Sequence, residues 1–281
     1  MNRKPLCGST ATEIGMGTYY DKPWIRVAKH GWSMGARTKV KALRAGLDNG
    51  ISLIDTAEAY YTEPFVAKAV KGRKRDDLFI ATKVWLDHLH RDDLVKALEG
   101  SLRRLEMSYV DLYQIHFPNK SVPIGETMGA MEELMAQGKI RAIGVSNFSV
   151  EQMEEANSAL SKFEISASQF NYSLIHRKVE KDLIPYCSKN HISVLAYYPL
   201  GHGILARHSE KLDSICRRNS KTPAQVALNW LVSKPGVFAI PRASRPSHVL
   251  ENLGGSGWRL SNADVEELDG EFPVERVAEG T

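Results

Sequence analysis

The feature that most constrains this chain is a regular alternation of short apolar, β-branched runs with longer amphipathic segments. Eight runs are expected to be strands: residues 14–18, 51–54, 78–82, 110–115, 140–145, 165–169, 193–196 and 237–240. Apolar positions at helical spacing predict helices between them, over residues 39–49, 63–71, 92–105, 125–137, 150–160, 178–190 and 223–232. This alternation predicts a parallel α/β sheet, and eight units favour closure into a (β/α)8 TIM barrel.

Length and composition agree with one large domain. The chain has 281 residues, of which 43% are hydrophobic and 25% charged, and a (β/α)8 barrel takes roughly 250 residues. Because no Pro-rich or Ser-rich linker divides the sequence, residues 1–281 are expected to form a single domain, with a short N-terminal hairpin before the barrel.

The charge pattern, the apolar runs and the cysteine spacing together exclude several classes of partner. The net charge of +4 is spread along the chain, and the densest basic run, residues 71–75, is typical of a solvated helix end rather than a nucleic-acid patch. The start lacks the apolar stretch of a signal peptide, and no run approaches the ~18 apolar residues of a membrane span. Three cysteines without metal-ligand spacing indicate reduced thiols. We therefore expect a soluble, cytoplasmic protein, monomeric or weakly oligomeric, without nucleic-acid, membrane or metal partners.

Four polar residues follow three successive predicted strands. Asp55 and Tyr60 come after the second strand, Lys83 after the third and His116 after the fourth. The carboxyl ends of parallel strands lie on one face, so these side chains are expected to converge. An adjacent ammonium would make the Tyr60 phenol a usable acid, and the imidazole could donate to the same substrate oxygen. Such a set suits polarisation of a carbonyl group.

Each of these residues also has a structural interpretation. Asp55 and Lys83 could form an ion pair inside the barrel, and a lone histidine after a strand is often structural. Residues 87–90, Asp-His-Leu-His, resemble part of a metal-binding site, but the sequence has no further ligands at a suitable spacing. Residues 15–19 lack the third glycine of a Gly-x-Gly-x-x-Gly fingerprint, which excludes a Rossmann mode of dinucleotide binding.

Seven segments in order resemble the aldo-keto reductase superfamily almost from end to end. They are Gly15–Thr18, Asp55–Tyr60, Ala81–Trp85, Gln114–His116, Gly144–Phe148, Ala196–Gly201 and Ile240–Ser244, the last followed by Glu251 and Asn252. The resemblance implies an (α/β)8 barrel that transfers a hydride between NAD(P)H and a carbonyl group, without metal or flavin.

Residue by residue, the resemblance implies a catalytic set and a cofactor site. Tyr60 is similar to the general acid, Lys83 and Asp55 to its tuning pair, and His116 to the orienting donor. Ser146, Asn147 and Gln169 match positions that hydrogen-bond the nicotinamide carboxamide, and Tyr197 matches the ring that stacks on the nicotinamide. The remaining residues expected at the cofactor are Gly17, Thr18, Asp55, Tyr198, Leu200, Gly201, Arg242, Ala243, Ser244, Arg245, His248, Glu251 and Asn252.

The expected phosphate site departs from the family pattern. Many members have Lys-Ser after the last strand and an arginine six residues beyond the lysine, and this chain has Arg242, Ala243 and His248 there. A guanidinium suits a phosphate well, and Ser244 and Arg245 lie beside it. We expect NADP(H) to be preferred, with NAD(H) as the alternative cofactor.

The predicted substrate pocket is small and open. It comprises Tyr19, Tyr60, Trp85, His116 and Phe117, and both the loop after His116 and the C-terminus are short. A small-molecule carbonyl compound is the expected substrate. Two other functions stay open: a Schiff-base aldolase that uses Lys83, and a regulatory subunit that binds NADPH with little turnover.

Overall fold

A closed barrel of parallel strands forms the centre of the computed structural model, which describes residues 1–30, 35–201, 203 and 209–274. Within these residues one sheet has the order β10-β9-β8-β7-β6-β5-β4-β3. Its strands are β3 (Met16–Gly17), β4 (Leu53–Asp55), β5 (Phe79–Val84), β6 (Leu112–Ile115), β7 (Ile143–Ser146), β8 (Ile165–Asn171), β9 (Ser193–Tyr197) and β10 (Val237–Ala239). Parallel bridges join Ile14 to Ala239 and Gly17 to Arg242, so the first and last strands meet and the predicted barrel is confirmed.

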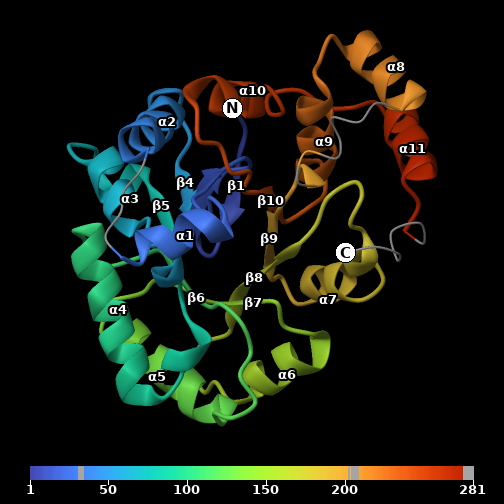
Figure 1. Ribbon diagram of the computed structural model, residues 1–281. Coiled ribbons are helices and arrows are strands. Elements are labelled where there is room, and N and C mark those ends of the chain that lie inside the picture. The colour runs from blue at the N-terminus through green and yellow to red at the C-terminus, as the bar shows by residue number, and fades with distance from the viewer. Residues whose placement is uncertain (31–34, 202, 204–208, 275–281) are drawn as a thin grey trace.

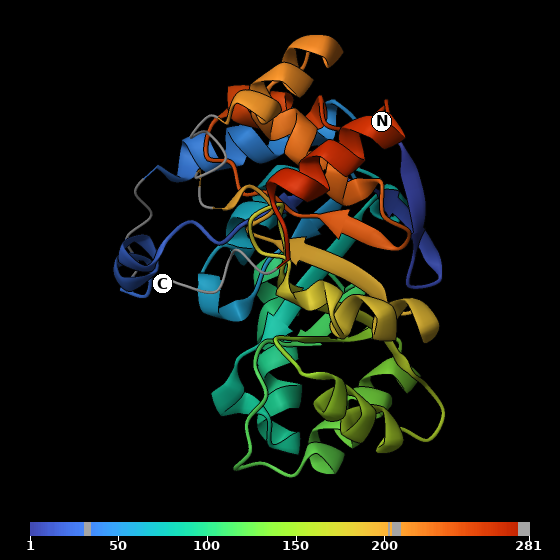
Figure 2. The ribbon, with the colours of Figure 1, turned by 90° about the vertical axis from the view of Figure 1, so that its right-hand side faces the viewer.

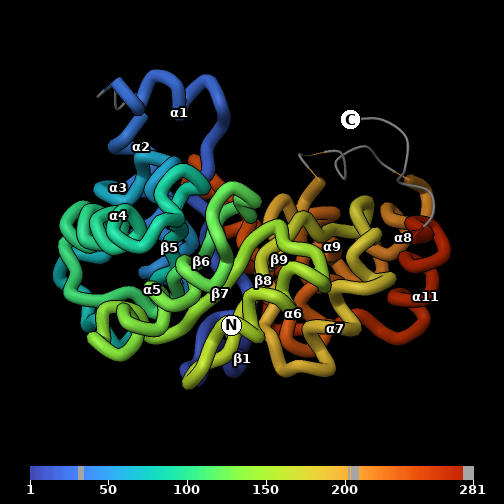
Figure 3. Tube along the Cα trace, turned by 90° about the horizontal axis from the view of Figure 1, so that it is seen from below, coloured from blue at the N-terminus to red at the C-terminus, as the bar shows by residue number. Residues whose placement is uncertain are grey.

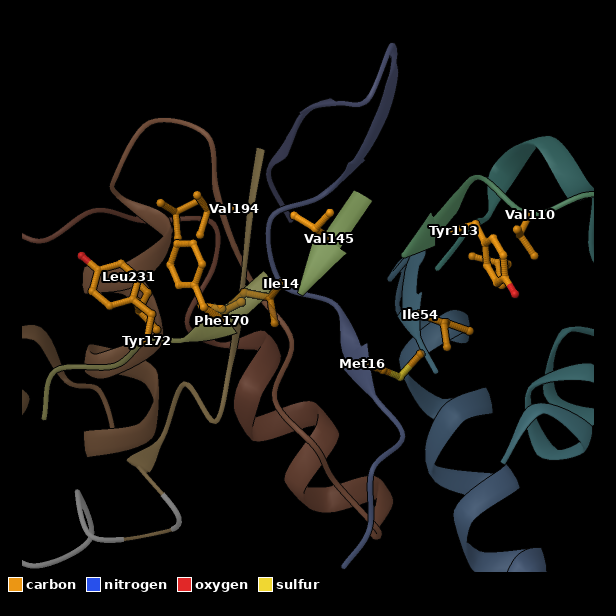
Figure 4. Packing of buried hydrophobic residues seen from close by; sticks show 14 of the residues in the cluster. Ile14, Met16, Ile54, Val110, Tyr113, Val145, Phe170, Tyr172, Val194 and Leu231 are labelled. Carbon is orange, nitrogen blue, oxygen red and sulfur yellow. The ribbon is translucent and has the colours of Figure 1, made fainter. Parts of the chain in front are cut away.

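Helices surround this barrel as an outer layer (Figure 1). They are α2 (Ala36–Asp48), α3 (Glu63–Val70), α4 (Arg91–Leu105), α5 (Ile124–Ala136), α6 (Val150–Ser158), α7 (Leu183–Lys189), α9 (Pro223–Val232) and α10 (Pro246–Leu253). Buried aliphatic and aromatic side chains fill the space between sheet and helices, among them Ile54, Phe170 and Leu231 (Figure 4). In the described part of the chain, no helix has the length and apolarity that a membrane span requires.

The helices of the structure differ from the predicted ones in two ways: one begins later than predicted, and four were not predicted. The helix expected over 178–190 is a 3-10 turn, Lys178–Glu180, followed by α7 from Leu183. Pro185 explains the late start, because it lacks an N–H and its ring excludes the carbonyl four residues earlier from a helix. Four more helices were not predicted: α1 (Lys22–Ala28), α8 (Glu210–Asn219), α10 and α11 (Asn262–Glu271). Three of them follow capping side chains, and α10 opens on a proline.

The expected N-terminal hairpin is present and closes one end of the barrel. Strands β1 (Arg3–Leu6) and β2 (Ser9–Thr12) pair antiparallel. Leu6 and Ala11 are fully buried and belong to the apolar cluster inside the barrel. The hairpin and α1 lie at opposite ends of the molecule in both side views (Figures 2 and 3).

The barrel interior changes from apolar to polar along four of its strands. Successive side chains of a strand alternate between two faces, so residues two apart share the interior. The apolar residues and the polar residues that follow them two positions later are Leu53 and Asp55, Ala81 and Lys83, Leu112 and Gln114, and Ala167 and Gln169; all are buried. A polar layer therefore lies one step above the apolar interior, at the carboxyl ends of the strands.

Candidate active site

A cavity of about 930 Å³ opens at the carboxyl ends of the strands. The residues that line it extend from 17 to 242 in the sequence, and closure of the barrel brings them together. The predicted residues that line it are Gly17, Tyr19, Asp55, Tyr60, Trp85, His116, Phe117, Ser146, Asn147, Gln169, Tyr197, Tyr198 and Arg242. Its volume is within the range of sites that bind small molecules and cofactors.

The four residues expected to be catalytic meet at the base of this cavity. The Tyr60 hydroxyl lies 3.2 Å from His116 Nε2, within hydrogen-bond distance. Lys83 Nζ donates to Asp55 Oδ2 at 2.6 Å and to the Thr56 carbonyl at 2.9 Å. The same ammonium lies 5.0 Å from the centre of the Tyr60 ring. Lys83 itself is fully buried, and it is not among the described residues that line the cavity.

Burial dominates the protonation of this set. It raises the pKa of the Tyr60 phenol well above its usual value, and the Asp55 carboxylate adds to that shift. Burial also lowers the pKa of Lys83, while the ion pair with Asp55 opposes the decrease. Burial and the Lys83 charge lower the pKa of His116 to about 2. Near neutral pH the phenol therefore holds its proton and the imidazole is neutral.

Aromatic rings form the walls around His116. Phe117 stacks on the imidazole with a centroid distance of 4.9 Å, and Trp85 meets it edge-on at 5.2 Å. Tyr19 lies edge-on to Tyr60 at 5.2 Å. The five residues of the expected substrate pocket are thus in ring contact with one another, and the phenol oxygen of Tyr60 lies within hydrogen-bond distance of His116 Nε2.

Amide and hydroxyl groups line the side of the cavity formed by β7, β8 and β9. The Tyr197 hydroxyl donates to Asn147 Oδ1 at 2.7 Å, and Asn147 Nδ2 donates to the His116 carbonyl and to Ser146 Oγ, both at 3.0 Å. Gln169 Nε2 donates to Asp55 Oδ1 at 2.9 Å. Asn147 has a φ of 63°, a left-handed conformation that few non-glycine residues adopt. The surrounding hydrogen bonds hold it there.

The residues expected around the phosphate are less tightly grouped. Arg242 lines the cavity, and its Nη1 donates to Ser244 Oγ at 3.2 Å. The structure does not bring the other members of this set into the cavity lining: Ala243, Ser244, Arg245, His248, Glu251 and Asn252 follow Arg242 into α10, and Leu200 and Gly201 follow β9. Thr18 is buried, where its hydroxyl donates to the Asp55 carbonyl and contacts Thr62 Oγ1 at 2.8 Å.

Sequence reasoning missed one whole wall of the cavity. The wall comes from α1 and its C-cap residue, and its members are Lys22, Ile25, Arg26 and Lys29. A local signal was available: Asp21 caps the helix by accepting from the Trp24 N–H at 2.6 Å, and Pro23 stands in the first turn. Other lining residues that were missed are Glu58, Ala59, Tyr61, Asp87, His88, Arg104 and Ile240.

The two histidines of the metal-like run have separate partners. His88 Nδ1 lies 3.0 Å from Glu58 Oε1, and His90 Nδ1 lies 3.2 Å from Glu126 Oε1. Within the described ranges, no group of three or more His, Cys, Asp or Glu side chains is arranged to hold a metal ion.

A model of the aldo/keto reductase family matches residues 13–271. The chain belongs to the aldo/keto reductase family. It is 37% identical to the methylglyoxal reductase YeaE of Escherichia coli, covering 86% of this chain and 89% of that protein. It is 34% identical to the aldo-keto reductase YhdN of Bacillus subtilis, over 93% of this chain and 90% of that one.

Solved structures of the family have the same fold as this chain. An aldo-keto reductase from Klebsiella pneumoniae in complex with NADPH superposes with a TM-score of 0.87 at 34% identity, covering 99% of this chain and 98% of that chain. The resemblance expected from seven short motifs therefore extends to the whole described fold.

Proposed function

We propose that this protein is an NADPH-dependent reductase that transfers a hydride to the carbonyl carbon of small aldehydes or ketones, with Tyr60 as the general acid. The observation that carries the proposal is the 3.2 Å approach of the Tyr60 hydroxyl to His116 Nε2 in a cavity, above a buried Lys83–Asp55 ion pair. Relatives named methylglyoxal reductase and glyoxal reductase, at 37% and 36% identity, support a carbonyl substrate.

The cavity has the chemistry that a nicotinamide cofactor requires. Asn147, Ser146 and Gln169 offer amide and hydroxyl groups that complement a carboxamide, and the Tyr197 ring lines the same side. Arg242 is an exposed cation at the cavity wall and suits a phosphate. These residues would hold the cofactor, which supplies the hydride when it is bound. The Klebsiella pneumoniae relative, solved in complex with NADPH, supports NADP(H) as the preferred form.

The residues of the chain supply the proton and the orientation. The Tyr60 hydroxyl and the neutral imidazole of His116 face the same point of the cavity, so both can hydrogen-bond one carbonyl oxygen. Because burial keeps its pKa high, the phenol holds the proton that the developing alkoxide takes. The Lys83 ammonium then lies 5.0 Å from the ring of the phenolate and stabilises it.

The aldolase alternative is disfavoured by the position of its nucleophile. Lys83 is fully buried, and its ammonium donates to Asp55 and to the Thr56 carbonyl. A Schiff base requires a neutral amine that the substrate carbonyl can reach. The ion pair with Asp55 opposes loss of the Lys83 proton, and Lys83 is not among the described residues that line the cavity.

The experiment is a measurement of NADPH oxidation with a panel of methylglyoxal, glyoxal, simple aldehydes, aldoses and ketones. We expect turnover with at least the small dicarbonyl compounds, and a kcat at least ~100-fold lower after Tyr60→Phe. Binding of NADPH without oxidation on any member of the panel would contradict the proposal and favour a regulatory subunit. Borohydride trapping of a substrate on Lys83 would favour the aldolase instead.

A further inference from the structure

Helix α1 is fixed against the barrel by one buried side. Trp24 is 8% exposed and packs edge-on against Tyr20 at 5.4 Å and Phe65 at 5.7 Å. The Lys39 ammonium lies 5.0 Å from the Trp24 ring centre and 4.8 Å from that of Tyr20. These contacts set the rotation of the helix about its axis. The opposite side of α1 is thereby turned toward the cavity.

The side of α1 that borders the cavity is strongly basic. Its residues are Lys22, Ile25, Arg26 and Lys29, and the first and last are separated by two helical turns. Positions i, i+3, i+4 and i+7 form one continuous stripe on a helix, and Trp24 lies roughly opposite. This stripe therefore presents three cations and one isoleucine to the cavity, and no carboxylate.

Within the described ranges, these three cations have no acidic partner. No hydrogen bond or ion pair joins the side chain of Lys22, Arg26 or Lys29 to another residue of the described ranges, and all three are exposed. By contrast, the Arg104 guanidinium at the cavity wall donates to the buried Glu63 at 2.6 Å. In most proteins such exposed cations would be a solvated face; here the face is the wall of the catalytic cavity.

Three carboxylates line the described cavity, and Asp55 among them pairs with Lys83. Glu58 accepts a hydrogen bond from the Trp85 N–H and lies 3.0 Å from His88 Nδ1. Glu58 and Asp87 therefore have no Lys or Arg partner in the described residues. Beside the three α1 cations these two carboxylates still leave a surplus of positive charge in the space above Tyr60. An anion in that space gains attraction that a neutral molecule of the same shape does not.

We propose that the basic side of α1 selects carbonyl substrates that carry a carboxylate. Lys22, Arg26 and Lys29 bind the carboxylate while the carbonyl group, at the other end of the molecule, lies against Tyr60 and His116. This inference rests on the proposed reductase function and names its substrate class. The three residues act by binding and orientation, away from the reacting atoms, so their effect falls on KM more than on kcat.

The test compares two aldehydes that differ in one charge, 4-carboxybenzaldehyde and its neutral methyl ester, with NADPH. We expect wild-type protein to have the higher kcat/KM for the carboxylate. Lys22→Gln, Arg26→Gln and Lys29→Gln should each lower that value about 2- to 5-fold, the range of an exposed ion pair. The ester should change by less than about 2-fold. The preference should also weaken as salt is raised.

Two controls separate selection from other effects. Arg217→Gln on α8 removes the same charge from an exposed position away from the cavity, and it should leave both aldehydes unchanged. The dissociation constant of NADPH, measured in each α1 variant, should stay at the wild-type value.

The outcomes that overturn the inference are distinct. Equal kcat/KM for the two aldehydes in wild type, with both reduced, would contradict this inference alone. Weaker NADPH binding in the α1 variants, with a parallel loss for both aldehydes, would assign the cations to the cofactor phosphates instead. Failure of wild type to reduce either aldehyde, or any member of the carbonyl panel, would contradict the proposed function and this inference together.

Discussion

The two ends of the barrel interior are built from the same strands but have opposite chemistry. At the amino end, Leu53 and Phe79 pack against Leu6 of the hairpin, and this cluster is apolar and fully buried. Asp55, two residues after Leu53, and Lys83, four residues after Phe79, face the same interior as a buried ion pair. The first end can only stabilise the fold. The second carries the cost of burying polar groups, and it is the end to which we assign proton transfer.

This contrast shows how the barrel separates stability from chemistry. In these strands, the burial of apolar residues offsets the free-energy cost of burying a polar residue on the same face. Leu112 precedes Gln114 in this way, and Ala167 precedes Gln169. Substitutions at the amino end should therefore change the free energy of unfolding and leave kinetics unaltered. Substitutions at the carboxyl end should change catalysis first.

The largest expected effect is at the carboxyl end. Tyr60→Phe removes the acidic proton and little volume, so kcat should fall by at least the ~100-fold typical of general acid catalysis. The free energy of unfolding should change by no more than about 1.5 kcal/mol, because a single hydrogen bond to His116 is lost. Steady-state kinetics and urea unfolding measure the two quantities. Wild-type turnover in this variant would break the contrast.

Lys83→Met should affect both catalysis and stability. It leaves the Asp55 carboxylate buried without its partner, which costs about 3–5 kcal/mol of unfolding free energy. It should also flatten or shift the pH profile of kcat, because the charge behind Tyr60 is gone. The double variant with Asp55→Asn should recover stability without activity. A kcat profile of unchanged shape would make Lys83 a structural residue.

At the amino end, Leu6→Ala should reduce the free energy of unfolding by about 2–5 kcal/mol, the usual cost of a cavity at a fully buried leucine. Because the hairpin lies at the opposite end from the cavity, kcat and KM at a temperature where the variant is folded should equal those of wild type. A change in kcat would show that the two ends are coupled.

The next effect is a pH dependence of stability from His116. The folded protein holds its pKa at about 2, whereas the usual value is 6.5. Below pH 6.5 the unfolded chain binds a proton that the folded protein does not, so the unfolding free energy falls as pH decreases. The slope from this residue should be about 1.4 kcal/mol per pH unit. Urea unfolding of wild type and His116→Gln at pH 6 and pH 5 measures it; equal slopes would contradict it.

The smallest expected effect concerns the cofactor phosphate. Arg242→Ala should weaken NADPH binding about 10-fold, near the lower end for a charge-assisted hydrogen bond, because the guanidinium is exposed. NADH binding should change little, and the dissociation constants of both cofactors test this. Equal losses for both cofactors, or a wild-type preference for NADH, would exclude phosphate recognition by Arg242.

Much of the catalytic end could be predicted from local pattern. Strand residues alternate with period two, and parallel strands end on one face, so the sequence predicts that Asp55, Lys83 and His116 lie together. The pattern failed at α1, where the Asp21 cap and Pro23 were overlooked. It also failed to say that Thr18 points into the packing against Thr62 rather than into the cavity.

The sequence by itself determined the barrel and which residues are candidates for reactive groups, because hydrophobic periodicity and strand-end position are local properties of the chain. Only the tertiary structure decided how those groups are protonated and what surrounds them. Burial, which lowers the pKa of His116 and raises that of Tyr60, depends on side chains brought from distant strands. The same holds for α1: its sequence makes one side basic, but the packing of Trp24 against Tyr20 and Phe65 turns that side toward the cavity.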